Sequence, residues 1–180
     1  MRSVERAPRL SIVIPVLNEA PTLATHLMAL QTLRAQGVEV IVVDGGSGDD
    51  SVRRAKPLAD RVLSSPPGRG VQMNLGAQHA SAPALLFLHA DTHLPTGAVE
   101  QLLHALNTHD WGRFDILLAG HSRWLPLISK MINQRSRLTG IATGDQGIFV
   151  RASTFQAIGG FPEQPLMEDI ELTKRLKRVS

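Results

Sequence analysis

The sequence contains no cysteine and no tyrosine, and only 4% of its residues are aromatic. Without cysteine the chain has no disulfide bond, no thiolate nucleophile and no cysteine-based zinc site. So few aromatic rings argue against a surface that stacks the bases of single-stranded nucleic acid, and we expect no nucleic acid partner. No apolar run approaches the roughly 20 residues needed to span a bilayer, and the first nine residues lack the apolar core of a signal peptide. We therefore expect a cytoplasmic protein without a membrane span.

The length of 180 residues predicts one domain, residues 1–180, with room for a sizeable core. The last residues still follow a helical pattern, and we expect the domain to be truncated at its C-terminus. A net charge of +3 suits a phosphorylated small molecule or an anionic membrane surface, which leaves peripheral contact with a membrane open.

Short β-branched runs alternate with amphipathic segments along the chain, a pattern that predicts parallel strands joined by helices. Strands are expected at Leu10–Val16, Val38–Val43, Arg61–Leu63, Leu85–Leu88, Phe114–Ala119 and Gly147–Val150. Helices are expected from Pro21 to just before Gly37 and at Ser51–Leu58, Val71–Ala80, Thr96–Leu106, Leu125–Leu138, Ser153–Ile158 and Ile170–Val179. The predicted fold class is α/β, with a mostly parallel sheet flanked by helices.

Polar residues gather where the predicted strands end, at Asn18 and Glu19, at 44–50, and at His89 and Asp91. Ligands of open α/β sheets bind outside the carboxyl ends of the strands, so these residues predict one binding crevice. An imidazole and a carboxylate two residues apart can share a divalent ion that holds a diphosphate. Equally, Asp91 can cap the helix that begins near Thr96 while His89 is an ordinary polar residue, and this stretch alone does not decide.

Asp44 is followed by a glycine-rich turn that has neither the spacing of a dinucleotide fingerprint nor that of a P-loop. Its carboxylate can accept the imide N–H of a uracil or a ribose hydroxyl, or it can simply belong to a turn whose Asp49 or Asp50 caps a helix. A phosphatase of the haloacid dehalogenase type needs an aspartate nucleophile where His89 stands, which argues against that class.

Three acidic residues within Met167–Glu171 lie at the start of a predicted helix, where the helix dipole favours negative charge. The apolar pair Leu166 and Met167 offers a second interpretation, because an apolar approach desolvates a carboxylate and suits it to general base catalysis.

Four segments in this order resemble family 2 glycosyltransferases of the GT-A fold: SIVIPVLNE (Ser11–Glu19), VVDGGSGDDS (Val42–Ser51), FLHADTHLP (Phe87–Pro95) and GGFPEQPLMEDIELTKRLKR (Gly159–Arg178). The chain is most similar to the bacterial rSAM/selenodomain-associated transferase 2 subgroup, over essentially its whole length. The resemblance implies a GT-A type, Rossmann-like nucleotide-binding sheet. It also implies metal-assisted, inverting transfer from a nucleotide-diphosphate sugar, by family habit a UDP-sugar, to a hydroxyl of a small-molecule or lipid-linked acceptor.

The resemblance also implies roles for individual residues. Asp91, with His89, would hold a divalent metal, Mn2+ or Mg2+, and Asp169 of the Glu168–Asp169 pair would be the catalytic base. The residues implied in substrate binding are Pro15, Asn18, Glu19, Asp44, Gly46, Arg69, Gln72, Asn74 and Asp145. The family's DxD motif reads His89-x-Asp91 here, which shifts the metal preference towards Mn2+ or softer ions. The family's Arg-Asn pair reads Met73-Asn74, so contact with phosphate falls to Arg69 or Gln72.

Two alternatives to the transferase stay open, namely a nucleotidyltransferase-like enzyme and a catalytically degenerate protein that binds a nucleotide sugar. The segment Trp124–Leu138 also has two interpretations, a core helix or a helix with an exposed apolar face for a lipid or a partner.

Overall fold

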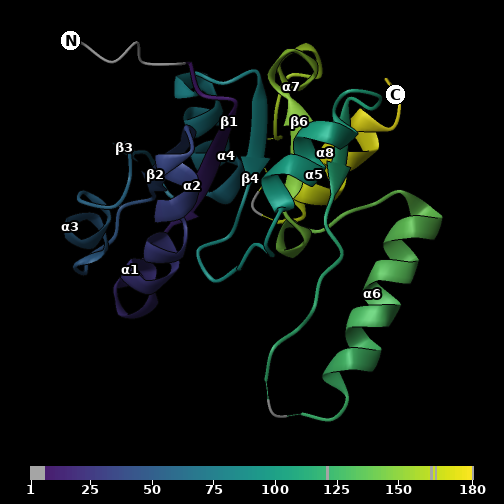
Figure 1. Cartoon of the computed structure of the whole chain (residues 1–180), viewed down its shortest axis with the longest axis horizontal. Helices are drawn as coiled ribbons and strands as arrows, with labels where there is room; N and C mark the ends of the chain where they lie inside the picture. Colours follow the sequence, from purple (N-terminus) through teal and green to yellow (C-terminus); the bar gives the residue numbers. More distant parts are fainter. Residues whose placement is uncertain (1–6, 121, 163, 165, 180) are drawn as a thin grey trace.

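A computed structural model describes residues 7–120, 122–162, 164 and 166–179 of the chain. Its centre is a six-stranded sheet in the order β3-β2-β1-β4-β6-β5 (Figure 1). The strands are β1 (Leu10–Val16), β2 (Val38–Asp44), β3 (Arg61–Ser64), β4 (Ala84–Phe87), β5 (Trp111–Arg113) and β6 (Ile148–Arg151). The first four strands of this order are parallel, and β6 runs antiparallel to both β4 and β5. The predicted fold class, a mostly parallel α/β sheet, is confirmed.

Helices cover both faces of the sheet. They are α1 (Ala20–Ala29), α2 (Gln31–Ala35), α3 (Ser51–Ala55), α4 (Arg69–His79), α5 (Ala98–Ala105), α6 (Leu125–Thr139), α7 (Ala152–Ala157) and α8 (Glu168–Leu176), with a single 3-10 turn, η1 (Gly144–Gln146). Apolar side chains of α1 and α5 share one core cluster, and those of α4, α7 and α8 share the other. The domain is therefore a three-layer α/β/α arrangement.

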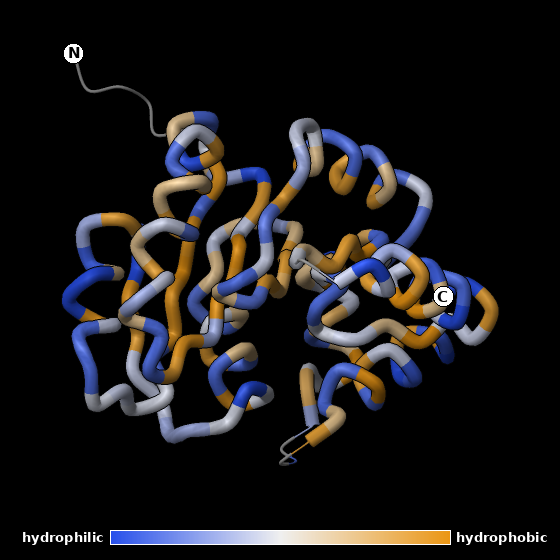
Figure 2. The backbone as a smooth tube through the Cα atoms, turned by 90° about the horizontal axis from the view of Figure 1, so that it is seen from below, coloured by the Kyte–Doolittle hydropathy of each residue, from blue (hydrophilic) through white to orange (hydrophobic). Residues whose placement is uncertain are grey.

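Strand β1 explains the two core layers, because its side chains alternate between them. Leu10, Ile12 and Ile14 join the cluster under α1 and α5, whereas Val13 joins the cluster under α4. Hydrophobic residues accordingly run along the central strands in Figure 2. Pro15 lacks an N–H donor, but the ladder with β4 spans only residues 11–13, so the missing donor leaves that ladder intact.

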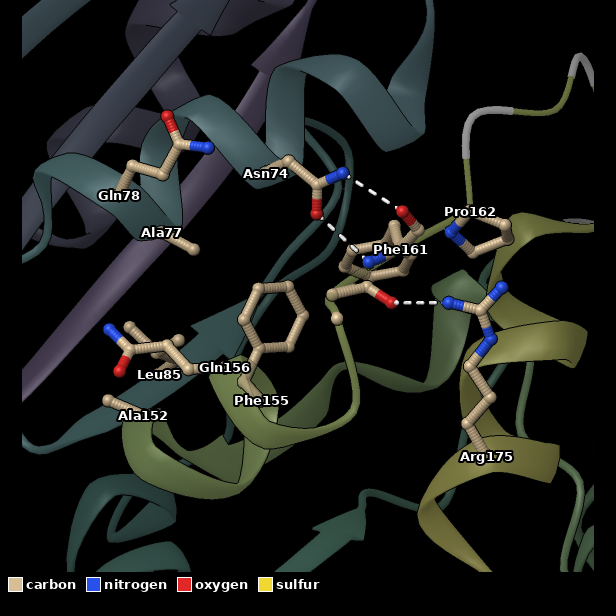
Figure 3. A pocket seen from close by; sticks show the side chains of 12 residues that line it. Asn74, Ala77, Gln78, Leu85, Ala152, Phe155, Gln156, Phe161, Pro162 and Arg175 are labelled. Atoms are coloured by element: carbon tan, nitrogen blue, oxygen red, sulfur yellow. Dashed lines mark hydrogen bonds between the residues drawn. The ribbon is translucent and has the colours of Figure 1, made fainter.

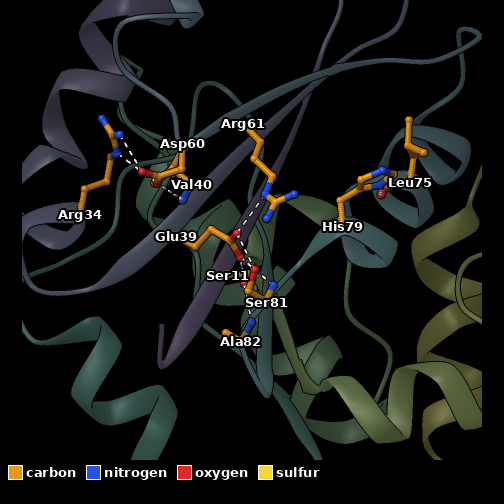
Figure 4. Close-up of polar contacts among 10 residues, drawn as sticks. All are labelled: Ser11, Arg34, Glu39, Val40, Asp60, Arg61, Leu75, His79, Ser81 and Ala82. Carbon is orange, nitrogen blue, oxygen red and sulfur yellow. Dashed lines mark hydrogen bonds and ion pairs between the residues drawn. The ribbon is translucent and has the colours of Figure 1, made fainter. Parts of the chain in front are cut away.

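A buried carboxylate joins the amino ends of the strands (Figure 4). Glu39 of β2 accepts hydrogen bonds from the hydroxyl groups of Ser11 and Ser81, from the backbone N–H of Ser81 and from the guanidinium of Arg61. These donors come from β1, from β3 and from the loop before β4, so one side chain ties three strands and that loop together. The opposite, carboxyl end of the sheet carries the polar clusters predicted to bind a ligand.

Two expected elements differ from the structure. The helix expected from Pro21 onward is divided at Leu30 into α1 and the short α2. The strand expected at Phe114–Ala119 is wrong, because the edge strand β5 ends at Arg113. The residues beyond it bond to side chains instead: the Ile116 backbone pairs with the Asn133 amide, and the Leu118 N–H bonds to the Ser129 hydroxyl.

Helix α6 is not a core helix. Its buried side chains are Ser129 and Ser136, whereas most of its large apolar side chains are exposed. It lies to one side of the sheet at the end of a long extended connection (Figure 1). Within the described part of the chain, no helix is long and apolar enough to cross a membrane.

Candidate active site

A cleft of about 330 Å³ opens at the carboxyl ends of β1 and β4, where the strand order reverses direction along the chain. Such a switch point is the usual ligand site of an open α/β sheet. The residues that line the cleft are Pro15, Val16, Leu17, Glu19, Gly68, Arg69, Gln72, His89, Ala90 and Asp91. Six of these are site residues expected from the sequence, which therefore come together in space.

The loop after β2 is organised by two side chains at the neighbouring strand ends. Asp44 is buried, and its carboxylate accepts the N–H groups of Gly46 and Ser47. Asn18, in the left-handed conformation that asparagine tolerates, accepts the N–H of Gly48 through its side chain. Asp44 thus forms the turn that the sequence offered as one interpretation. Asp44, Gly46 and Asn18 adjoin the cleft and are not among the described residues that line it.

A further carboxylate ties this loop to the start of α1. Asp49 accepts the N–H of Ala20 and the hydroxyl of Ser51. The hydrogen bond from Ser51 is the main cause that lowers the pKa of Asp49, with backbone N–H donors acting in the same direction. The loop that follows β2 is therefore held from both sides by charged acceptors.

Gln72 and Asn74, both expected to bind substrate, use their amides on the protein backbone. The NH2 group of the buried Gln72 donates to the carbonyls of Val16 and Val43, at 2.9 and 2.8 Å, and so joins the ends of β1 and β2. Asn74 donates to the Phe161 carbonyl and accepts the Phe161 N–H, both at 2.9 Å (Figure 3). Gln72 still lines the cleft, whereas Asn74 lines a separate cavity of about 460 Å³ between α4, α7 and α8.

The turn η1 brings Asp145 to the cleft. Its carboxylate Oδ1 lies 3.3 Å from Nδ1 of His89. The hydrogen bond from His89 lowers the pKa of Asp145, and electrostatic interactions with His89 and Arg69 act in the same direction against the opposing effect of burial. Asp145 was expected to bind substrate, and the structure places its carboxylate against the imidazole that lines the cleft.

Gly144 of the same turn contacts two of the candidate site residues, which the sequence reasoning did not foresee. A Cβ atom on this residue would lie 2.4 Å from Nε2 of His89, closer than real Cβ contacts come. The N–H of Gly144 donates to Oδ2 of Asp169 at 2.7 Å. The one signal in the sequence was the glycine beside Asp145, which marks a turn but not what the turn touches.

Asp169 and Glu168 open helix α8 on the far side of this turn. Asp169 accepts two N–H groups, from Gly144 at Oδ2 and from Ile170 at Oδ1, which fixes the direction of its carboxylate. Glu168 is buried, and both acids line a small cavity that also contains His89 and Gly144. The expected desolvation by Leu166 and Met167 is wrong, because both side chains are largely exposed. Burial around Glu168 comes from Met73, Phe87, Ile148 and Phe161 instead.

The residues expected to bind a metal form only part of a coordination shell. No cluster of three His, Cys, Asp or Glu side chains that could hold an ion is present among the described residues. Asp91 is exposed, and its carboxylate accepts a hydrogen bond from the hydroxyl of Thr92 at 3.4 Å. Mg2+ and Mn2+ sites in phosphate-transferring and related enzymes commonly use one or two carboxylates and complete the shell with water and substrate phosphates. A carboxylate and an imidazole in one cleft fit an ion of that kind.

The chain was compared with known protein families and with curated relatives. The model of "Glycosyl transferase family 2" matches residues 11–152. The undecaprenyl-phosphate 4-deoxy-4-formamido-L-arabinose transferase of Klebsiella pneumoniae (strain 342) is 28% identical over 163 residues, which cover 80% of this chain and 48% of that protein. The chain spans about half the length of the curated relatives it matches.

Solved structures share the fold. A mannosyltransferase from Pyrobaculum calidifontis, in complex with GDP-Man and Mn2+, aligns with a TM-score of 0.71 at 21% identity and covers 95% of this chain and 52% of that chain. Glucosyl-3-phosphoglycerate synthase from Mycobacterium tuberculosis, in complex with Mn2+, UDP and glucosyl-3-phosphoglycerate, aligns with a TM-score of 0.69 at 22% identity. It covers 95% of this chain and 66% of that chain.

Proposed function

The chain belongs to glycosyl transferase family 2 and has the GT-A fold, and we propose that it is an inverting enzyme that moves a sugar from a nucleotide-diphosphate sugar to a hydroxyl group. One observation carries the proposal. A cleft at the switch point of the sheet is lined by Arg69, Asp91 and His89, and a carboxylate fixed by two N–H donors, that of Asp169, lines a small cavity that shares His89 with this cleft. A donor and an acceptor would meet between the cleft and this cavity.

The donor side consists of Arg69, Asp91 and His89. Arg69 is the first residue of α4, so its guanidinium and the positive end of the helix dipole face the same cleft. A diphosphate placed there would be neutralised by both. The cleft volume of about 330 Å³ lies within the usual range of small-molecule sites. Neighbours of the same fold that were solved with GDP-Man or with UDP support a nucleoside diphosphate as the ligand, with UDP as our first choice.

A divalent cation, Mn2+ or Mg2+, would be held by Asp91 and His89, and when bound it supplies charge neutralisation to the leaving diphosphate. His89 is not free for this role in the present arrangement, because its Nδ1 faces Asp145. Its second nitrogen, Nε2, faces Gly144. Asp91 is therefore the principal metal ligand in this proposal, and His89 is the secondary one.

The acceptor side consists of Asp169 with Glu168 beside it. In the proposed reaction an acceptor oxygen forms a bond to the anomeric carbon while the bond from that carbon to the diphosphate breaks. The hydroxyl proton passes to the carboxylate of Asp169, which the N–H groups of Gly144 and Ile170 hold in one orientation. Attack from the face opposite the leaving group inverts the configuration. The acceptor is proposed to be a lipid-linked or small-molecule alcohol, and the name of the Klebsiella relative supports the lipid-linked class.

Titration calorimetry with UDP and with GDP, each in the presence of Mn2+, Mg2+ or a chelator, tests the donor half of the proposal. We expect one nucleotide to bind in a metal-dependent manner and Asp91→Asn to weaken that binding by about tenfold or more. Asp110→Asn is the control, because this partly exposed aspartate lies just before β5, does not line the cleft and pairs with Arg151. Failure of both nucleotides to bind under every condition would overturn the proposed donor class.

The acceptor half rests on Asp169→Asn, which keeps the shape of the side chain but removes its basicity. We expect nucleotide binding to be unchanged and turnover of the donor, measured as release of the nucleoside diphosphate, to fall by 10²–10⁴-fold. Loss of nucleotide binding in this variant, with the fold intact by circular dichroism, would contradict the role of Asp169 as a base. Normal donor binding without any turnover in the parent chain would favour the degenerate binding protein.

A further inference from the structure

Helix α6 packs against the rest of the protein through its polar side. Ser129 bonds to the Leu118 N–H, and Asn133 bonds to both the N–H and the carbonyl of Ile116. The serines at 129 and 136 are the buried side chains of this helix. Helices of water-soluble domains normally turn their apolar side inward, so this orientation is the reverse of the usual one.

The outward side of α6 carries exposed apolar side chains. Trp124, Leu127, Ile128, Met131 and Leu138 are spaced three, four and seven residues apart, which places them on one face. All five are exposed, from 41% for Ile128 to 82% for Leu138. We call these five residues the outer stripe of α6, which is interrupted between Met131 and Leu138 by polar side chains. Large apolar side chains that gather on the exposed side of a helix are typical of an interaction site.

Basic residues lie beside the outer stripe and, at Arg135, within it. Arg123, Lys130 and Arg135 are exposed, and the stretch from Ser122 to Thr139 contains no acidic residue. Within the part of the chain that the structure describes, none of these three cations forms an ion pair. Arg137 differs, because it pairs with Asp115. The unpaired charges around the stripe are therefore all positive.

We propose that α6 docks on an anionic lipid surface, with its outer stripe at the level of the headgroups and acyl chains and its cations on the lipid phosphates. A helix with a tryptophan and leucines on one side and lysine or arginine at the margins binds interfaces through apolar burial plus attraction to anionic lipid. A second copy of the chain is a poorer occupant. In a dimer formed through this face, three unpaired cations of one copy would lie near three of the other, with no carboxylate between them to offset the repulsion.

Docking of α6 would also orient the candidate active site. The helix ends at Gly140, and the chain continues directly to Gly144 and Asp145 of the turn η1. The side chain of Lys177, at the end of α8, bonds to the Thr139 carbonyl and so joins the end of α6 to the helix that begins with Glu168 and Asp169. A lipid-bound α6 would thus hold the proposed acceptor side close to the bilayer. This last step rests on the proposed function, whereas the docking itself does not.

Cosedimentation with vesicles tests the docking. Phosphatidylcholine vesicles and vesicles that also contain phosphatidylglycerol are the two probes, and we expect measurable binding only to the anionic ones, weakened by added salt. Met131→Glu should lower the partition coefficient by about tenfold or more, because it removes an apolar side chain and adds a repelled charge. Met28→Glu is the matched control, since Met28 on α1 is 58% exposed and Met131 is 62% exposed. This control should bind as the parent chain does.

The tryptophans give a second, spectroscopic readout. The chain has two, Trp111 in the half-buried strand β5 and the exposed Trp124 at the start of the stripe. Binding to anionic vesicles should shift the fluorescence to shorter wavelength, and brominated lipids should quench it. Trp124→Phe should abolish both signals while the protein still sediments with the vesicles.

Three outcomes would overturn the proposal. The first is no sedimentation with anionic vesicles while the chain is folded by circular dichroism. The second is equal binding by the Met131→Glu and Met28→Glu variants. The third is a dimer in analytical ultracentrifugation that Met131→Glu dissociates, with no vesicle binding, which would assign the stripe to a second copy. None of these outcomes depends on nucleotide binding or turnover, so failure of the docking and failure of the proposed function are distinguishable.

Discussion

Replacement of Gly144 by alanine tests the contact on which the geometry of the candidate site depends. The Cβ atom of the new side chain would lie 2.4 Å from Nε2 and 2.6 Å from Cε1 of His89, about 1 Å inside ordinary van der Waals contact. The φ angle of Gly144 lies outside the left-handed region, so alanine adds no backbone strain of its own. Any cost of the substitution must therefore arise from the collision with the imidazole.

The expected magnitude follows from that overlap. Overpacking of this size costs roughly 1–3 kcal/mol of the free energy of unfolding. Relief by movement of the imidazole breaks its contact with Asp145, and relief by movement of the turn breaks the bond from Gly144 to Asp169. Because a displacement of about 1 Å in a catalytic constellation can cost on the order of 10²-fold in rate, we expect a comparable loss of turnover.

A double-mutant cycle with His89→Ala isolates the collision. Urea unfolding of the parent chain, the two single variants and the double variant gives the four free energies of unfolding. In the His89→Ala background the overlap is absent, and Gly144→Ala should be neutral or stabilising by about 0.4–1 kcal/mol through the unfolded state. Gly48→Ala serves as a stability control, since its Cβ would meet no atom within 4 Å.

Two results of this cycle would refute the proposed collision at His89. If Gly144→Ala destabilises the chain equally with and without the imidazole, the cost does not arise at His89. A fully stable Gly144→Ala variant with unchanged nucleotide turnover would refute both the collision and the importance of the turn. The Gly48→Ala control should stay within about 0.5 kcal/mol of the parent chain in either case.

Three further predictions concern the frame of the domain and use urea unfolding as the measurement. Glu39→Ala should cost roughly 2–3 kcal/mol, because it leaves the buried Ser11 hydroxyl and the partly buried Ser81 N–H without an acceptor; no loss would contradict this role. Gln72→Leu should cost about 2 kcal/mol by orphaning two strand-end carbonyls, and an unchanged midpoint would show that water replaces the amide. Burial raises the pKa of Asp60, but hydrogen bonds from Arg34 and the Val40 N–H outweigh this effect, so the pKa lies below its ordinary value of 3.8. The ionised Asp60 therefore contributes to the free energy of unfolding above pH 3.8, and this contribution is lost as the pH falls through the lower pKa of the folded state. Asp60→Asn should accordingly destabilise the chain at neutral pH but not in strong acid.

The strands and the switch-point crevice could be predicted because each depends on local pattern. The β-branched run Leu10–Val16 is a strand with the predicted ends, and Val38–Asp44 extends the predicted strand by one residue. Parallel strands bring their carboxyl ends to one edge, so polar residues that follow three strands had to meet. The resemblance of the four motifs to family 2 glycosyltransferases is confirmed by the match to that family. The strand-end pattern placed Glu19, His89 and Asp91 at one crevice, and Arg69, which the resemblance implied, lines the same cleft.

The hydrogen-bond partners of individual side chains could not be predicted in this way. Gln72 and Asn74 lie two residues apart on α4, and both types of amide suit contact with phosphate. Gln72 bonds to the carbonyls of Val16 and Val43, which are 56 and 29 residues away in the sequence. Asn74 bonds to Phe161, which is 87 residues away. No spacing in the sequence carries that information. The resemblance therefore named both residues as substrate ligands but did not reveal that the backbone already engages their amides.

The error at Phe114–Ala119 and the orientation of α6 have one physical origin. An isolated amphipathic segment such as Leu125–Thr139 has an apolar side and a polar side, and the periodicity says nothing about which side finds the protein. The extended segment before this helix does not pair with a neighbouring strand. Its backbone groups at Ile116 and Leu118 bond instead to the side chains of Asn133 and Ser129. Once those polar side chains are used inward, the apolar side of α6 must face outward. The outer stripe is thus exposed because the extended segment before α6 bonds to the polar side of this helix. The cations near the stripe favour an anionic surface as its partner.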